Sequence, residues 1–62
     1  MNLVDMATIL RGVAFQSLAC ARSYRCGHKA PRSILEVDGG WVVMSCRGAD
    51  VAVADGLGVI VK

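Results

Sequence analysis

The spacing of apolar residues changes once along this chain, and that change constrains the fold more than any other feature. Over residues 3–22 the apolar side chains recur at helical intervals and cover about half of a helical wheel. From residue 33 onward they fall in short runs rich in β-branched residues, separated by turns that contain glycine. A helix followed by a sheet is therefore expected, in a single small domain of 62 residues.

Residues 3–22 are predicted to form one amphipathic helix. Asn2 is a suitable N-cap, and Gly27 and Pro31 prevent the helix from running further. Gly12 lies inside the predicted helix, where glycine costs about 1 kcal/mol relative to alanine. Either another element packs closely against Gly12, or the helix is weak at that point.

The segment 33–62 is predicted to form an antiparallel β-meander of three to four strands. The expected strands are 33–37, 41–46, 50–55 and 59–62. The sequence Asp38-Gly39-Gly40 is typical of a hairpin turn, and the strand after it is the most apolar, which favours a central position. With the N-terminal helix across one face of this sheet, the fold class is α+β.

The chain is more apolar than a monomer of this size easily accommodates. Hydrophobic residues make up 55% of it, whereas so short a chain buries only about 60% of its unfolded surface. Large exposed apolar patches usually mark interfaces. The last strand, 59–62, is short, apolar and expected at a sheet edge, where pairing with a second copy would protect it. We therefore expect a homodimer.

Positive charge is concentrated between the helical and the strand-like parts. The segment 22–32, RSYRCGHKAPR, holds four of the seven Lys and Arg residues and no carboxylate. We expect it to form a basic loop, 23–32, whose cations contact an acidic surface or phosphates while its tyrosine stacks on a base. Trp41 is of a residue type enriched at binding hot spots. The predicted partner-binding residues are Arg22, Tyr24, Arg25, Lys29, Arg32 and Trp41. A solvated loop whose cations cap the preceding helix is the alternative.

Four residues form a candidate zinc site: Cys20, Cys26, His28 and Cys46. Four ligands are what a closed structural site needs, and zinc would stabilise so small a fold. The spacing nevertheless departs from the usual knuckle of two cysteines two to four residues apart. Reduced thiols in a cytoplasmic protein are the alternative, since an odd number of cysteines argues against a disulfide scaffold.

No set of residues for catalysis is apparent. The sequence has a single His, and no serine or carboxylate stands in a recognisable nucleophile motif. Cys26 and His28 are close in sequence, but no third group is available to orient the imidazole, as an activated thiol requires. The pattern therefore indicates a binding protein and not an enzyme.

We therefore expect a small, non-enzymatic, inhibitor-like interaction or regulatory protein without a cofactor. Phages and mobile elements often encode small inhibitors of this size. It is expected to act as a dimer that binds a larger protein or a protein–nucleic acid complex through the basic loop and an apolar surface. The alternative is a nucleic-acid-binding module, stabilised by the Cys3His zinc site. Because Asp5 and Arg11 interrupt the apolar N-terminal segment, no contact with a membrane is expected, and the expected location is cytoplasmic.

Overall fold

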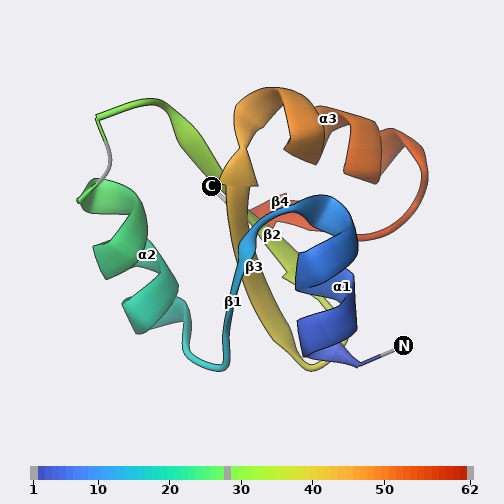
Figure 1. Cartoon of the computed structure of the whole chain (residues 1–62), viewed down its shortest axis with the longest axis horizontal. Helices are drawn as coiled ribbons and strands as arrows, with labels where there is room; N and C mark the ends of the chain where they lie inside the picture. The colour runs from blue at the N-terminus through green and yellow to red at the C-terminus, as the bar shows by residue number, and fades with distance from the viewer. Residues whose placement is uncertain (1, 28, 62) are drawn as a thin grey trace.

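The computed structural model describes residues 2–27 and 29–61. This part of the chain forms three helices and a four-stranded antiparallel sheet, which confirms the α+β class. The helices are α1 (Leu3–Leu10), α2 (Leu18–Cys26) and α3 (Cys46–Ala54). The strands are β1 (Val13–Phe15), β2 (Arg32–Val37), β3 (Gly40–Ser45) and β4 (Val59–Val61). Helices α1 and α3 lie on one face of the sheet and α2 lies on the other (Figure 1).

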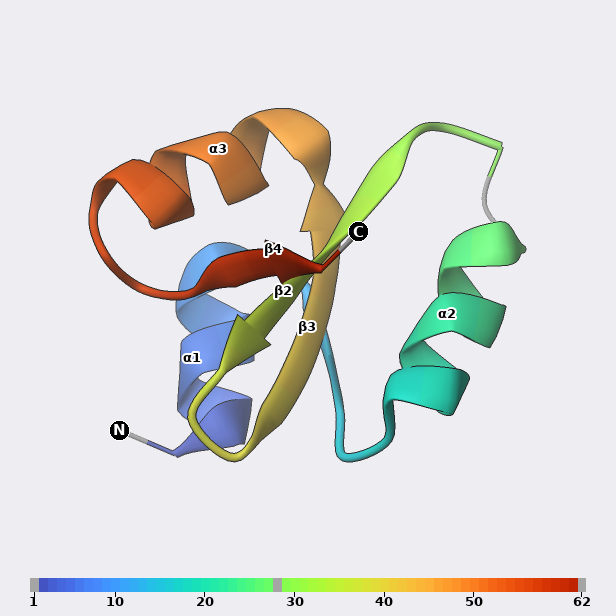
Figure 2. The same cartoon turned by 180° about the vertical axis from the view of Figure 1, so that it is seen from behind.

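The strand order is β1-β3-β2-β4, so the predicted meander is wrong. Only β2 and β3 are both consecutive in sequence and paired, and they form the expected hairpin. Val37 pairs with Gly40, which leaves Asp38 and Gly39 as a two-residue turn, and Gly39 has a φ of 88° that favours glycine. Strand β3 is central, as predicted, whereas β4 pairs with β2 alone at the edge of the sheet (Figure 2).

Two apolar clusters fill the spaces between the helices and the sheet. The larger one joins α1 and α3 to one sheet face and contains Ala7, Leu35, Val37, Val42, Met44, Ala49 and Ala52. The smaller one, under α2, contains Ala21, Ile34 and Val43, with Phe15, Leu18, Trp41 and Val61 packed against it. Consecutive residues of β2 and β3 thus belong to different clusters, because side chains alternate between the two faces of a sheet.

The single helix predicted over 3–22 is interrupted by β1. Helix α1 begins at its expected N-cap, where Asn2 Oδ1 accepts a hydrogen bond from the backbone N–H of Asp5 (2.8 Å). It ends at Arg11, which adopts the left-handed conformation with a φ of 56°. Gly12 then packs against β3, and Ser17 caps the start of α2. The apolar spacing looked continuous because two short helices and a strand each contributed inward-facing residues.

The strand predicted at 50–55 is instead the end of helix α3 together with its C-cap, Asp55. Ser45 caps this helix, and its Oγ accepts a hydrogen bond from the backbone N–H of Gly48 (3.2 Å). The alternation of valine with alanine imitated a strand, but Ala49 and Ala52 are three positions apart and both are buried. Two small side chains on one face of a helix allow close approach to the sheet, while Val51 and Val53 point outward and are exposed.

Candidate anion-binding site

The charged residues at the sheet are separated along β2. Arg32 is the first residue of this strand, whereas Glu36 and Asp38 lie at its other end, by the hairpin turn. Arg11 lies beside the basic end of the sheet, because its neighbour Gly12 packs against the second half of β3. The two arginines are therefore close in space although they are distant in sequence.

A pocket of about 140 Å³ lies between α2, the sheet and the turn from α1 into β1. Its lining residues are Arg11, Gly12, Val13, Tyr24, Arg32 and Val43. Val13 and Val43 are paired across β1 and β3 and provide an apolar surface. The ring of Tyr24 packs on that of Phe15, with centroids 5.2 Å apart and planes tilted by 48°. The pocket is thus lined by apolar residues and by two arginines.

Arg32 has a buried donor without an acceptor. Its Nε is buried and forms no hydrogen bond, and neither Arg32 nor Arg11 forms an ion pair within residues 2–27 and 29–61. A buried donor that lacks an acceptor costs about 1–3 kcal/mol. This donor of Arg32 is therefore left unpaired by the described part of the chain, at a cost in stability.

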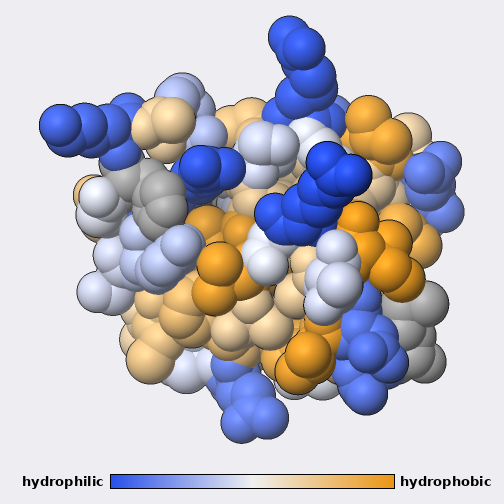
Figure 3. All heavy atoms as spheres, viewed as in Figure 1, coloured by the Kyte–Doolittle hydropathy of each residue, from blue (hydrophilic) through white to orange (hydrophobic). Residues whose placement is uncertain are grey.

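The predicted basic loop over 23–32 is helical for its first four residues, because α2 continues to Cys26. Arg22 is exposed, and Arg25 is half-buried in the last turn of α2, where a cation interacts favourably with the helix dipole. Lys29 is exposed in the connection to β2. Hydrophilic side chains lie over this end of α2 and the segment after it, whereas hydrophilic and apolar side chains are mixed over α1 and α3 (Figure 3).

Arg11 is a site residue that the sequence analysis missed. The uninterrupted helix predicted over 3–22 placed it on a helical surface, far from the segment 22–32. The pair Arg11-Gly12 was the available signal, because a helix often ends with a left-handed residue next to a glycine.

Trp41 does not join the basic residues. It pairs with Phe15 on one side and with Glu36 on the other, and it is half-buried against the cluster under α2. Since Arg32 and Glu36 are four positions apart in β2, Trp41 lies roughly 13 Å along the sheet from the basic end. The predicted partner-binding set is thus divided between two ends of the sheet.

The candidate zinc ligands are also distributed over the fold. Cys20 and Cys26 are exposed on α2, whereas Cys46 begins α3 on the opposite face of the sheet and accepts a hydrogen bond from Ser33 Oγ (3.2 Å). Among the residues that the structure describes, no three His, Cys, Asp or Glu side chains are grouped to hold a metal ion. His28 lies outside the described residues.

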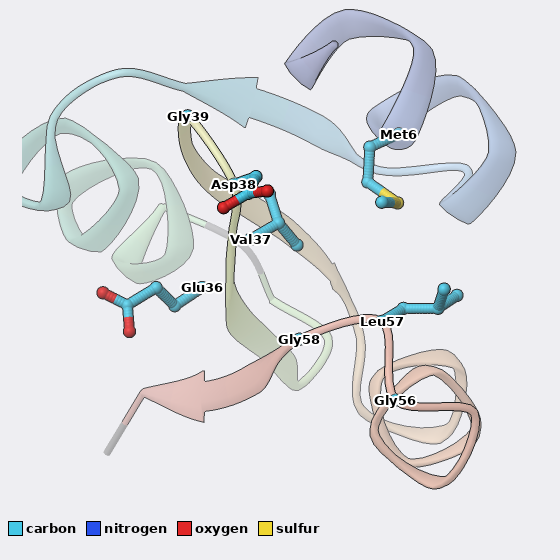
Figure 4. Close-up of a pocket in the computed structure, with 8 residues that line it drawn as sticks. All are labelled: Met6, Glu36, Val37, Asp38, Gly39, Gly56, Leu57 and Gly58. Atoms are coloured by element: carbon cyan, nitrogen blue, oxygen red, sulfur yellow. The ribbon is translucent and has the colours of Figure 1, made fainter. Parts of the chain in front are cut away.

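A larger pocket, of about 640 Å³, lies at the acidic end of the sheet. Its lining residues are Met6, Glu36, Val37, Asp38, Gly39, Gly56, Leu57 and Gly58. Figure 4 shows that the carboxylate of Glu36 points away from Met6 and Leu57, which lie together on the other side. None of these eight residues is a His, Cys or Ser, so the pocket offers no nucleophile–base pair of the usual kind.

No family model matches the chain, and searches of characterised proteins and of solved structures found no significant match. Within the described residues, none of the helices has the length and apolar character needed to span a membrane. The proposed function therefore depends on the residues of the candidate site alone.

Proposed function

We propose that this protein is a small, non-enzymatic binding protein that recognises an anionic surface of a larger macromolecule. The observation that carries this proposal is the pocket that Arg11 and Arg32 both line. Neither arginine is paired with a carboxylate in the described part of the chain. Two cationic residues that line one pocket favour the binding of an anion there. Here the anion belongs to the partner.

Exposed cations outside the pocket can extend this contact. Arg22 on α2 and Lys29 in the following connection are solvent-exposed, so a partner that covers α2 as well as the pocket would also meet positive charge there. Such a surface speeds the approach of an anionic partner by electrostatic steering. We propose an inhibitor-like role, of the kind that phages and mobile elements encode, on a larger protein or a protein–nucleic acid complex in the cytoplasm. The exposed thiols of Cys20 and Cys26 suit that reducing compartment.

Direct binding of nucleic acid is the second candidate, and the pocket size favours it. About 140 Å³ is well below the roughly 300–1,000 Å³ of pockets that hold whole small molecules. A single phosphate group is small enough for it. Tyr24 lines the same pocket and is 37% exposed, which leaves part of its ring accessible to a base.

We further propose that the protein is a homodimer, paired through β4. This strand has one neighbour only, and Val59 within it is 65% exposed. Val4, Ile9 and Val51 are also more than half exposed, so apolar surface is left uncovered on a chain of this size. Antiparallel pairing of β4 with the β4 of a second copy would cover an open edge in a symmetric assembly.

The binding proposal is tested by charge reversal outside the pocket lining. The double variant Arg22→Glu/Lys29→Glu and the wild-type protein are used as baits in cell extract, and captured partners are identified by mass spectrometry. Arg47→Glu is the matched control, because Arg47 is an exposed arginine on α3, on the opposite face from α2. We expect the double variant to lose the partners that wild type and control retain. Capture of the same partners by all three proteins would contradict the proposal.

A further inference from the structure

We propose that the pocket lined by Arg11 and Arg32 is a binding site for one phosphate group of a nucleic acid strand. This inference rests on the proposed function, in that the phosphate belongs to the anionic partner. It takes up the second candidate, direct binding of nucleic acid, and assigns one phosphate of the strand to the pocket between Arg11 and Arg32.

The topology places the two guanidinium groups on either side of a central strand. Strand β3 lies between β2, which begins with Arg32, and the segment that carries Arg11. Their backbones are therefore two interstrand spacings apart, roughly 10 Å. Both arginines line one pocket together with Val43 of β3, so a small anion seated there would have a cationic residue on either side.

The state of Arg32 indicates that the missing component is a hydrogen-bond acceptor. Its Nε is buried without a partner in the described part of the chain, although the side chain lines a pocket. An oxyanion is the strongest acceptor for a guanidinium group, which donates through Nε and the terminal nitrogens in a planar fork. Because Nε itself has no exposed surface, a phosphate oxygen in the pocket would accept from the terminal nitrogens of this guanidinium group.

The backbone of Arg11 gives a second, independent indication. Arg11 caps α1 in the left-handed region, with a φ of 56°, and its N–H bonds to the carbonyls of Ala7 and Thr8. It is the only described residue other than glycine with a positive φ. Glycine adopts this conformation without strain, so capping the helix does not by itself require an arginine at position 11. We infer that the arginine side chain has a role other than capping. Strain of this kind concentrates at ligand-binding positions.

The surroundings favour a nucleic acid over an isolated phosphate. Tyr24 lines the pocket and is 37% exposed, so a base next to the bound phosphate can stack on its ring. The exposed Arg22 and Lys29 provide further positive charge near the same end of α2. A strand carries a phosphate at every nucleotide, and neighbouring phosphates can therefore use these cations while one occupies the pocket.

The experiment follows backbone amide signals of the ¹⁵N-labelled protein by NMR at low salt. Titrants are inorganic phosphate, acetate at matched ionic strength, and a short single-stranded oligonucleotide. Two variants test the pocket: Arg32→Lys keeps the charge but removes the planar guanidinium fork, and Arg11→Gly removes the guanidinium while suiting the left-handed backbone. Arg47→Gln, outside the pocket, is the control.

We expect saturable shifts at Val13 and Val43 with phosphate, weaker shifts with acetate, and tighter binding of the oligonucleotide than of phosphate. Each pocket variant should weaken phosphate binding by about tenfold, the equivalent of one charged hydrogen bond, while the control binds as wild type does. Absence of saturable phosphate binding, or equal binding by Arg32→Lys and wild type, would overturn the site. Binding of phosphate without tighter binding of the oligonucleotide would overturn the nucleic acid source. Because Arg22 and Lys29 lie outside the lining, loss of the pocket is distinguishable from failure of the proposed function.

Discussion

Gly12 lies so close to Val42 that a Cβ atom at position 12 would be 2.5 Å from Cγ1 of the valine and 2.7 Å from the backbone oxygen of Val43. This contact joins the turn after α1 to the central strand β3. It holds Arg11 beside the sheet, and it converts the expected interior of one long helix into a short strand. Both the fold and the candidate anion site therefore depend on a residue without a side chain.

Replacing Gly12 with alanine is expected to destabilise the protein by about 1–3 kcal/mol, because the added methyl group must displace a buried valine and the backbone of β3. The free energy of unfolding is measured by chemical denaturation. Gly27→Ala is the matched control, since Gly27 has an ordinary φ of −78° and its nearest non-neighbour atom would be 3.5 Å from the new Cβ. Equal stability of the two variants would contradict the close packing of Gly12.

The assignment of α3 is tested by enlarging neighbouring side chains. Ala52→Leu should destabilise the protein by about 1–3 kcal/mol, because Ala52 is 2% exposed and packs against the sheet. Val51→Leu should change the free energy of unfolding by less than about 0.5 kcal/mol, since Val51 is 58% exposed. A strand with its valines directed inward would give the opposite order in thermal or chemical denaturation.

Assembly through β4 predicts a dimer by light scattering at micromolar concentration. Val59→Lys should convert it to a monomer, because a lysine on an edge strand opposes pairing with another edge. The side chain of Val59 is 65% exposed, so the fold itself should tolerate the change. Val51→Lys introduces the same charge at a similarly exposed position of α3 and should leave the dimer intact. A wild-type protein that scatters as a 6.5 kDa monomer would refute the assembly.

Metal removal should not affect the fold. Cys20 and Cys26 lie on α2 and Cys46 lies across the sheet at the start of α3, so the three thiols do not surround one ion. We expect elemental analysis of the purified protein to find no stoichiometric zinc, and the melting temperature to be the same with and without a chelator. A chelator-dependent drop in melting temperature would restore the zinc hypothesis.

The sequence predicted the local features of the fold better than its topology. The cap at Asn2, the turn at Asp38 and Gly39, and the central position of β3 depend on residues near one another in sequence. The pairing of β1 with β3 does not, because Gly12 reveals its close contact only when β3 is beside it. A glycine within an apolar helical pattern was the one visible sign of that contact.

The candidate site was also predictable only in part, because some of its residues are close in sequence and one of them is distant. Arg32 and Tyr24 belong to the basic segment that composition alone makes conspicuous, and both line the pocket. Arg11 enters the pocket only because α1 ends before it and β1 pairs with β3. The alternating valines and alanines of 51–54 misled the prediction. Ala52 and Ala54 fit the two-residue period of a strand, whereas Ala49 and Ala52 fit the three-residue spacing of one helix face. So short a run does not distinguish the two patterns.

The strand order also has a consequence for how this chain folds. The central hairpin of β2 and β3 consists of neighbouring residues, so it closes at a low entropic cost, while β1 and β4 join it from opposite ends of the sequence. The hairpin is the natural nucleus, and either outer strand can detach while the other remains paired. Local opening at β1 would separate Arg11 from Arg32 without unfolding the centre of the sheet. An anion that bridges the two arginines would therefore slow hydrogen exchange in β1 more than in β4.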